Sequence, residues 1–203
     1  DHSGIPYDGI NNYIYSNIAR TFSKKQLERL VKSVGFSNTY FYYPLPDYKM
    51  PQVVYSEEYL PKNGSIDNWI PYYEPNGNSM ISDEEHIYGD LVDNDVFEFF
   101  ANSFMVECCA GNEDIGEIQY AVSSPFRNKE YNMITVYSKN DGFYKIADSD
   151  SVNALKSTDN NHKMLDKRGL LVSETNIKGN VMYTKEITGT PLTERLLKEY
   201  AYK

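Results

Sequence analysis

Length, composition and charge limit the classes of protein to which this chain can belong. It has 203 residues, 40% of them hydrophobic, enough for one large or two small domains with a real core. The net charge is −9 without a basic stripe, so binding to a nucleic-acid backbone is not expected. No apolar run approaches the ~20 residues of a membrane span, and no signal-peptide pattern opens the sequence.

Cysteine and tyrosine content add two expectations. Cys108 and Cys109 are adjacent and offer no disulfide framework, which fits a reducing compartment and predicts a cytoplasmic location. The 19 tyrosines are typical either of a surface that stacks on carbohydrates or bases, or of half-buried sheet faces. The second use is the more common one.

Residues 20–60 contain the clearest local pattern, after a turn-rich segment over residues 1–19. Ser23 and Gln26 are spaced as a capping box, and Gly35 supplies the left-handed position that ends a helix. The apolar positions of this helix share one face: Leu27, Leu30, Val31 and Val34. The pattern predicts a helix, an aromatic strand over residues 39–43 and, after three prolines, a short strand over residues 52–55.

The next segments predict a less regular stretch. Residues 56–61 suggest one helical turn, and residues 62–82 a long insertion. A helix is expected over residues 83–97, and an interior strand over residues 99–109, where apolar residues occupy both faces in part.

Composition changes at residues 110–114, so we expect two domains, residues 1–111 (with an insertion at about 62–98) and residues 112–203. The second should contain hairpins and helices. Its expected elements are a strand over 118–122, a hairpin of 132–137 with 143–147, a helix over 152–165, a hairpin of 170–175 with 180–187, and a helix from about 190.

Motifs of self-contained catalysis are missing from the sequence, including phosphate loops, nucleophile elbows and His-Glu-x-x-His. The three histidines, His2, His86 and His162, lie far apart, so no metal site is expected. The acidic pair Glu57–Glu58 could supply an acid and a base, but a solvated helix start is the simpler interpretation.

The first half resembles the C-terminal part of class I S-adenosylmethionine-dependent methyltransferases, of a bacterial group associated with cell-surface polysaccharide biosynthesis. The resemblance covers about residues 1–109. It rests on Asp1-His2-Ser3-Gly4, Tyr7-Asp8-Gly9-Ile10, residues 19–27, Val34-Gly35-Phe36, residues 41–49 and residues 55–61. Within it, residues 99–106 would be the last, antiparallel strand of the methyltransferase sheet.

The resemblance implies which residues lie near a substrate, although it indicates no catalytic residue. They are Asp1, His2, Tyr7 and Arg20, with Asp47, Tyr48 and Lys49 as weaker candidates. The glycine-rich turn and the acidic strand end that hold S-adenosylmethionine in this family have no counterpart in the chain. We therefore expect the parent enzyme to use S-adenosylmethionine, and this chain alone to bind no cofactor and to be inactive.

Residues 118–203 more distantly resemble the small lobe of kinase-like proteins, with residues 186–192 similar to a hinge segment. Lys145 would lie on the strand that carries the phosphate-binding lysine of such proteins, but residues 118–135 lack a glycine-rich loop. The catalytic and metal-binding aspartates would come after residue 203. Nucleotide binding by this chain is therefore not expected.

Together these patterns predict an α+β or α/β chain: the C-terminal half of a Rossmann-like methyltransferase sheet, followed by a small, mostly antiparallel α+β domain. The expected function is that of a methyltransferase fragment whose parent acts on a sugar or glycan-linked acceptor. The alternative is a non-enzymatic, Tyr-rich α+β binding or scaffold module. Because half a sheet would leave an exposed edge, we expect the chain to form a homodimer.

Overall fold

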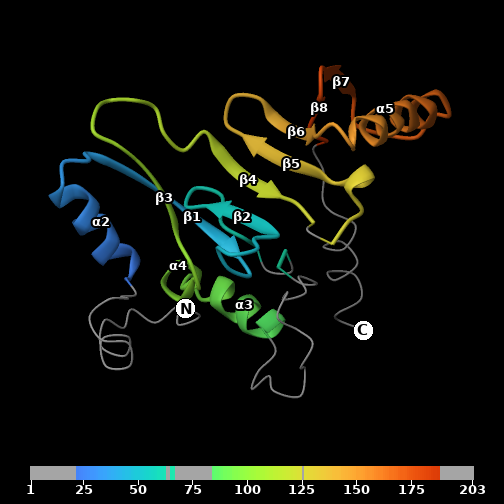
Figure 1. Cartoon of the computed structure of the whole chain (residues 1–203). Coiled ribbons are helices and arrows are strands. Elements are labelled where there is room, and N and C mark those ends of the chain that lie inside the picture. The colour runs from blue at the N-terminus through green and yellow to red at the C-terminus, as the bar shows by residue number, and fades with distance from the viewer. Residues whose placement is uncertain (1–21, 63–64, 67–83, 125, 188–203) are drawn as a thin grey trace.

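The computed structural model describes residues 22–62, 65–66, 84–124 and 126–187, and all that follows concerns these residues. They form an α+β fold with one eight-stranded sheet, in the order β3-β1-β2-β4-β5-β6-β8-β7 (Figure 1). The elements are α2 (Lys24–Ser33), β1 (Asn38–Leu45), β2 (Val53–Ser56), α3 (Glu84–Asp93), α4 (Phe97–Phe100), β3 (Met105–Cys109), β4 (Ile118–Val122), η2 (Lys129–Tyr131), β5 (Met133–Ser138), β6 (Gly142–Ala147), α5 (Val152–Lys167), β7 (Thr175–Lys178) and β8 (Val181–Thr184).

Helix α2 begins and ends as its sequence predicts. The Ser23 hydroxyl accepts the Gln26 backbone N–H, and the Gln26 side chain accepts the Ser23 N–H at 2.9 Å. Gly35 follows the helix with a φ of +106°. The apolar face is nevertheless only partly buried, since Leu27 packs against the larger core whereas Leu30 and Val34 are 47% and 68% exposed. The helix is confirmed, but the described residues provide only part of the surface against which it could pack.

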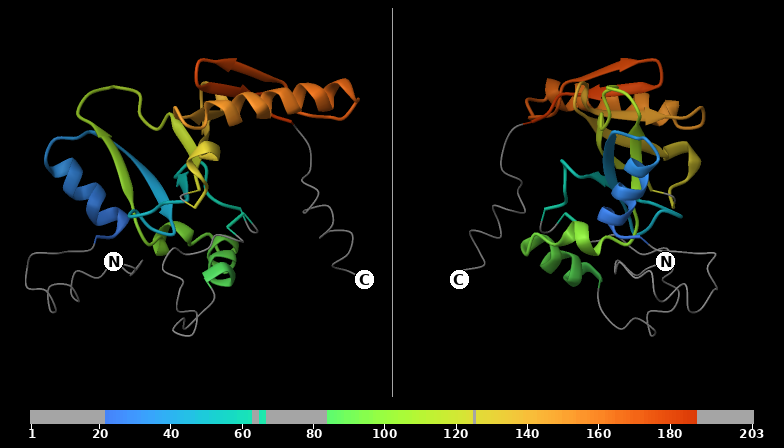
Figure 2. Two further views of the ribbon diagram at one scale, coloured as in Figure 1. Left: turned by 45° about the vertical axis from the view of Figure 1, so that its right-hand side comes forward. Right: turned by 90° about the vertical axis from the view of Figure 1, so that its left-hand side faces the viewer.

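All helices that pack on the sheet use the same face. Cross-strand partners point to one side of a sheet, and the pairing joins Tyr43, Tyr55, Tyr120, Tyr137 and Phe143 in one row across five strands. The larger core lies at the β1–β2 end of this face, and the smaller core at the β6–β8 end. Figures 1 and 2 show α2, α3 and α4 near one end of the sheet and α5 at the other.

The two cores differ in size. The larger one contains Phe41, Tyr43, Leu45, Val53, Tyr55, Ile66, Tyr88, Phe97 and Ala101. The smaller one contains only Ala147, Leu155 and Met182, with partly buried neighbours around them. The large, mostly aromatic core supplies most of the apolar burial that holds the described fold together.

The predicted interior strand over residues 99–109 is wrong in extent and position. Only Met105–Cys109 is a strand, and it lies at the edge of the described sheet. Asp95 takes a left-handed φ of 57° after α3, and a new helix, α4, begins at Phe97. The Phe97 ring then packs against Tyr43 and Tyr88, with centroid separations of 5.6 and 6.1 Å. Packing of this aromatic ring into the core favours the helix over a continued strand.

The Rossmann-like part of the predicted fold class is not confirmed, because every strand pair among the described residues is antiparallel. Parallel neighbours need long crossovers, usually through a helix, whereas this chain mostly returns through hairpins and loops. Strand β2 pairs with β4, so strands on both sides of the predicted boundary at residues 111–112 share one sheet.

The second half follows its predicted pattern closely. The first hairpin and the long helix α5 are confirmed, and the second hairpin is confirmed in type, although β7 (Thr175–Lys178) shares only Thr175 with the strand predicted over 170–175. Most of the insertion predicted over residues 62–82 (residues 63–64 and 67–82) and the final helix from about 190 lie outside the described residues. None of the described helices combines the length and the apolar character that crossing a membrane requires.

Candidate functional site

The residues predicted to lie near a substrate divide into two groups. Asp47, Tyr48 and Lys49 form the loop between β1 and β2, after a cis peptide bond at Leu45–Pro46. The other four lie outside the described residues: Asp1, His2, Tyr7 and Arg20. The structure therefore places only the weaker candidates.

Asp47 anchors the loop, whereas its neighbours face solvent. Asp47 is 2% exposed, and its carboxylate accepts the backbone N–H of Lys49 at 2.7 Å and that of Met50 at 3.4 Å. This is the local turn that aspartate favours. Tyr48 is exposed, with Lys49 Nζ 5.8 Å from its ring centroid. A ligand could therefore contact Tyr48 and Lys49 directly, while Asp47 holds their backbone in place.

The connection between α4 and β3, residues 101–104, is hydrogen-bonded to this loop. The Ser103 hydroxyl accepts the backbone N–H of Tyr48 at 3.3 Å. The Asn102 side-chain amide donates to the Pro46 carbonyl at 3.3 Å and to the Tyr88 hydroxyl at 3.0 Å. Segments far apart in sequence thus determine where the loop lies.

A charged network that the sequence did not reveal joins α2, β1, α4 and the turn after β2. Lys24 Nζ, in the first turn of α2, lies 2.8 Å from Glu57 Oε2 and 2.6 Å from Glu98 Oε1. It also lies over the rings of Phe41 and Tyr43, 5.1 and 5.7 Å from their centroids. The Tyr43 hydroxyl donates a second hydrogen bond to Glu98.

The network keeps Lys24, Glu98 and Tyr43 in their ordinary charge states at neutral pH. Burial opposes the charge of Lys24, but the hydrogen bonds from its ammonium to Glu57 and Glu98 prevail and raise its pKa. Burial likewise opposes the charge of Glu98, yet the donors Lys24 and Tyr43 lower its pKa. Burial and the adjacent carboxylate raise the pKa of Tyr43. None of these three pKa values moves toward neutrality, so the network orients and stabilises rather than transfers protons.

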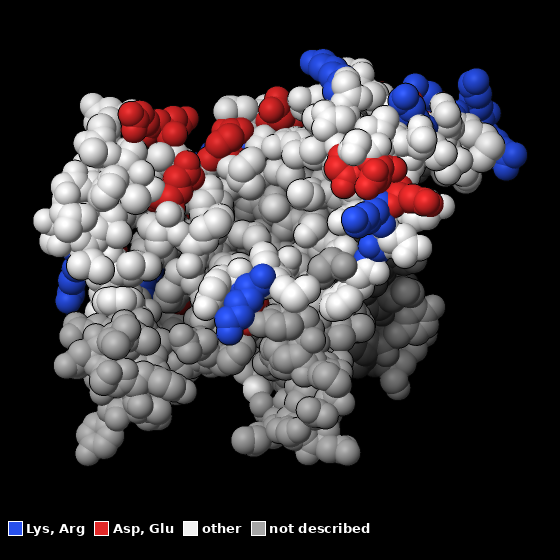
Figure 3. Space-filling view, viewed as in Figure 1, with Lys and Arg blue, Asp and Glu red and all other residues white. Residues whose placement is uncertain are grey.

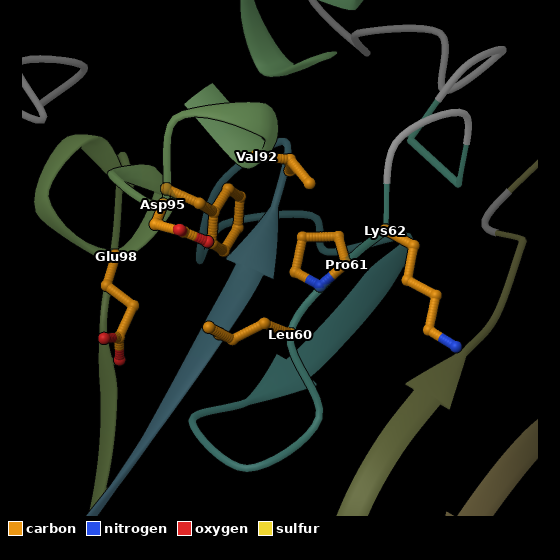
Figure 4. Close-up of a pocket in the computed structure, with 7 residues that line it drawn as sticks. Leu60, Pro61, Lys62, Val92, Asp95 and Glu98 are labelled. Carbon is orange, nitrogen blue, oxygen red and sulfur yellow. The ribbon is translucent and has the colours of Figure 1, made fainter. Parts of the chain in front are cut away.

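A pocket of about 480 Å³ lies beside this network. Figure 4 shows Asp95 and Glu98 on the side opposite Lys62, with Leu60 and Pro61 between them. The lining residues are Leu60, Pro61, Lys62, Val92, Asp95, Phe97 and Glu98. An apolar wall with a few charged groups at its rim suits a small ligand that combines both characters.

A second pocket, the Lys145 pocket, has a volume of about 320 Å³ and lies over β5, β6 and β8. Lys145 Nζ donates to Thr135 Oγ1 at 2.7 Å, and burial, followed by the nearby charge of Arg127, lowers the lysine pKa. Among the described carboxylates, none forms an ion pair with Lys145. The pocket is lined by Thr135, Phe143, Tyr144, Lys145, Ser173, Thr184, Lys185, Glu186 and Ile187.

An aromatic row leads into the Lys145 pocket across β2, β4, β5 and β6, and consists of Tyr55, Tyr120, Tyr59, Tyr137 and Phe143. Successive ring centroids along it are 5.3, 5.8, 5.2 and 4.6 Å apart. Tyr59 is 37% exposed, and burial raises the pKa of Tyr120 to about 12. The buried Tyr55 and the half-buried Tyr120 and Tyr137 confirm the expected use of tyrosine on a half-buried sheet face, whereas a stacking surface for carbohydrates or bases stays a prediction.

Charge is distributed unevenly over the face drawn in Figure 3. Acidic side chains gather over the loop between β3 and β4, where Glu113 and Asp114 are exposed, and a second acidic group lies below the Lys and Arg side chains of α5 and the β7–β8 hairpin. The α5 end therefore carries both signs of charge.

Sequence reasoning found part of these sites. The pair Glu57–Glu58 was expected at a solvated helix start, but it lies in a turn, where Glu57 pairs with Lys24 and Glu58 with Lys139 at 2.8 Å. Glu98 has no local signal at all, because its partners are remote in sequence. Lys145 was identified only through the kinase-like resemblance.

Within the described ranges, no group of three His, Cys, Asp or Glu side chains is placed to hold a metal ion. Both cysteines are free thiols. Comparisons with protein-family models, with curated proteins and with solved structures found no match to this chain.

Proposed function

We propose that the chain is the C-terminal part of a methyltransferase that uses S-adenosylmethionine, acts on a sugar or glycan-linked acceptor and is joined to a small accessory unit. The observation that carries the proposal is the outer edge of β3. Strand β3 pairs with β1 on one side, and no described strand pairs with its other side. Unpaired edges of this kind invite a further strand.

The surface beside this edge is apolar. The turn between α2 and β1 lies next to the end of β3, because the Ser37 N–H donates to the Cys109 carbonyl at 3.1 Å. In this turn Val34 and Phe36 are 68% and 36% exposed, and Met105, at the opposite end of β3, is 52% exposed. A preceding half of the sheet that paired along β3 would cover both the edge and these side chains. That half would hold the cofactor.

Methyl transfer by direct displacement depends on positioning more than on a strong acid or base. The exposed Tyr48 and Lys49 are the described residues that we propose to contact the acceptor, together with Asp1, His2, Tyr7 and Arg20. Their loop is held by Asp47 and Ser103, so its backbone is already ordered before an acceptor binds.

Isothermal titration with S-adenosylmethionine and S-adenosylhomocysteine tests the proposal. One sample is this chain, and the other is a protein extended upstream of Asp1 by ~200 residues, about one more domain. We expect only the longer protein to bind both compounds. Binding by neither protein, or equal binding by both, would overturn the proposal.

A substitution in β3 sharpens this test. Met105→Lys should destabilise the longer protein by about 2–4 kcal/mol, because the added half would bury the new charge, but should cost the present chain under ~0.5 kcal/mol. Ile134→Lys, on β5 and 45% exposed, is the matched control and should be mild in both. Equal effects of Met105→Lys in the two proteins would contradict a covering half at β3.

For the accessory unit we propose a relation to a kinase small lobe. Lys145 lies on β6, the third strand of the unit, where kinases carry their phosphate-binding lysine, and α5 packs on the same face. Residues 123–132, between β4 and β5, contain no glycine, and no described carboxylate of α5 pairs with Lys145. Nucleotide binding is therefore not part of the proposal.

The second candidate function is a non-enzymatic binding module, which the aromatic row favours. Tyr137 and Phe143 belong to neither core and are half-buried, and Tyr59, which packs against Tyr137, is 37% exposed. Retention of oligosaccharide by the present chain, without any cofactor binding in the longer protein, would select this candidate.

A further inference from the structure

We propose that the Lys145 pocket binds an acidic sugar, with the sugar carboxylate on Lys145 and the sugar ring against Phe143, the member of the aromatic row that lines the pocket. The site lies on the sheet face between the two cores, and Thr135, Lys145 and Phe143 belong to neither of them. It does not depend on methyl transfer, because all of its residues come from β5, β6, β8 and their neighbours.

Lys145 supplies the anion-binding group. Its ammonium has three N–H donors, of which one is used by Thr135 Oγ1 at 2.7 Å. Holding this partly buried charge without a carboxylate partner is unfavourable, and a ligand carboxylate would remove the penalty. Arg127 is close enough to lower the lysine pKa, so a second positive charge adds to the field at the pocket.

The surroundings favour a single negative charge over a phosphate chain. Polyphosphates are usually cradled by glycine-rich loops or by several cations. Here the loop over residues 123–132 has no glycine, and the carboxylate-bearing Glu186 lines the same pocket. Two lysines, Lys145 and Lys185, and one acidic residue, Glu186, line the pocket, and this set matches a sugar residue that presents one carboxylate and several neutral hydroxyls to it.

The remaining lining groups suit the ring and the hydroxyls of a sugar. The C–H groups of a pyranose face pack well on the negative face of an aromatic ring. Phe143 and Tyr137 form such a surface, with centroids 4.6 Å apart and planes inclined by 32°. Hydroxyls of Thr135, Ser173 and Thr184 line the pocket and both donate and accept. The volume of about 320 Å³ is that of a small-ligand site.

Titration of the present 203-residue chain by amide NMR tests the inference, with trigalacturonate as the acidic probe and maltotriose as the neutral one. We expect the acidic probe to bind at least about tenfold more tightly, since a charge-assisted hydrogen bond is worth that ratio. Amide shifts should concentrate at Thr135, Phe143, Lys145 and Thr184.

Two variants and a control make the result specific. Lys145→Gln should reduce the affinity for trigalacturonate to that for maltotriose, while Phe143→Leu should weaken both probes by a similar factor. Lys178→Gln is the control and should change neither affinity. Lys178 is exposed and follows Ile177, which packs against the smaller core, so its side chain lies on the opposite face of the sheet. Amide spectra of each variant verify that it is folded.

Three outcomes would overturn the inference: equal affinity for the two probes, no shifts at the pocket with either probe, or tighter binding of ATP than of trigalacturonate at these residues. None of them bears on the methyltransferase proposal, which is tested separately with the longer protein and S-adenosylmethionine.

Discussion

The two ends of the sheet reach stability by different means. At the β1–β2 end, aromatic rings fill a core in which Phe41 and Tyr43 are 1% and 0% exposed. At the β6–β8 end only three residues are buried in the core, and polar contacts tie the elements together. There Asp159, on α5, binds Lys163 at 2.6 Å and accepts a hydrogen bond from Thr175 at the start of β7.

Their surfaces do not show the same contrast. The end with the large core exposes Leu30, Val34, Phe36 and Met105, and the α5 end exposes Met164, Leu170, Leu171 and Ile187. A well-packed interior beside an apolar exterior is expected of a structure that continues into a partner or a preceding segment. Four predictions test the comparison between the two ends.

The largest effect on stability is expected from truncating one buried side chain in each core. Phe41→Ala should lower the free energy of unfolding by about 3–5 kcal/mol, and Leu155→Ala by about 2–4 kcal/mol, because the aromatic side chain leaves the larger cavity. Urea denaturation followed by circular dichroism measures both. A greater loss for Leu155→Ala would reverse the contrast between the ends.

Next in size is a close contact beside the larger core. A Cβ at Gly116 would lie 2.5 Å from the Tyr40 ring, and its φ is +76°. We expect Gly116→Ala to cost about 2–4 kcal/mol from the clash and the backbone strain together. Gly179→Ala is the control, since Gly179 has a φ of +63° with open space around it and should lose only about 1 kcal/mol. Similar losses would show that Tyr40 moves aside freely.

A smaller, pH-dependent effect is expected at the Lys24 network. The pKa of Glu98 is lowered in the folded state, so its stabilisation is present above its ordinary value of 4.5 and is lost as the pH falls through the folded pKa. Glu98→Gln should therefore cost about 1 kcal/mol at pH 7, allowing for solvent screening, and less at pH 3.

Thermal unfolding of both proteins at the two pH values measures this difference. The control is Glu174→Gln, whose ion pair with Lys185 is 3.4 Å long and exposed, and which should change stability by no more than a few tenths of a kcal/mol. A cost for Glu98→Gln that stays constant down to pH 3 would contradict an ionised Glu98 in the network.

The smallest effect on stability, but a clear one on association, is expected at β3. We expect the unmodified chain to form dimers at tens of micromolar, and Met105→Lys to make it monomeric while costing under ~0.5 kcal/mol. Light scattering measures both masses, with Ile134→Lys as the control that should leave the dimer intact. If the unmodified chain is monomeric at that concentration, the proposal that the β3 edge mediates association is contradicted.

Local patterns predicted much of the fold. The capping box at Ser23, the end of α2 at Gly35, both hairpins of the second half and α5 were all predicted from neighbouring residues. The apolar stretch that contains Phe97 and Met105 was not, because its division into α4 and β3 depends on the packing of the Phe97 ring. The Lys24 network was not predicted either, because it depends on contacts between residues far apart in the sequence.

By itself, the sequence determined where helices start, where turns fall and which strands form hairpins, since hydrogen bonds between near neighbours and steric limits on the backbone decide these features. Tertiary structure alone decided that β2 pairs with β4, that both cores share one face, and that Glu57 and Glu98 meet at Lys24. Such pairings join residues far apart in the chain. Their choice depends on which long-range contacts bury the most apolar surface and satisfy the most charges at once.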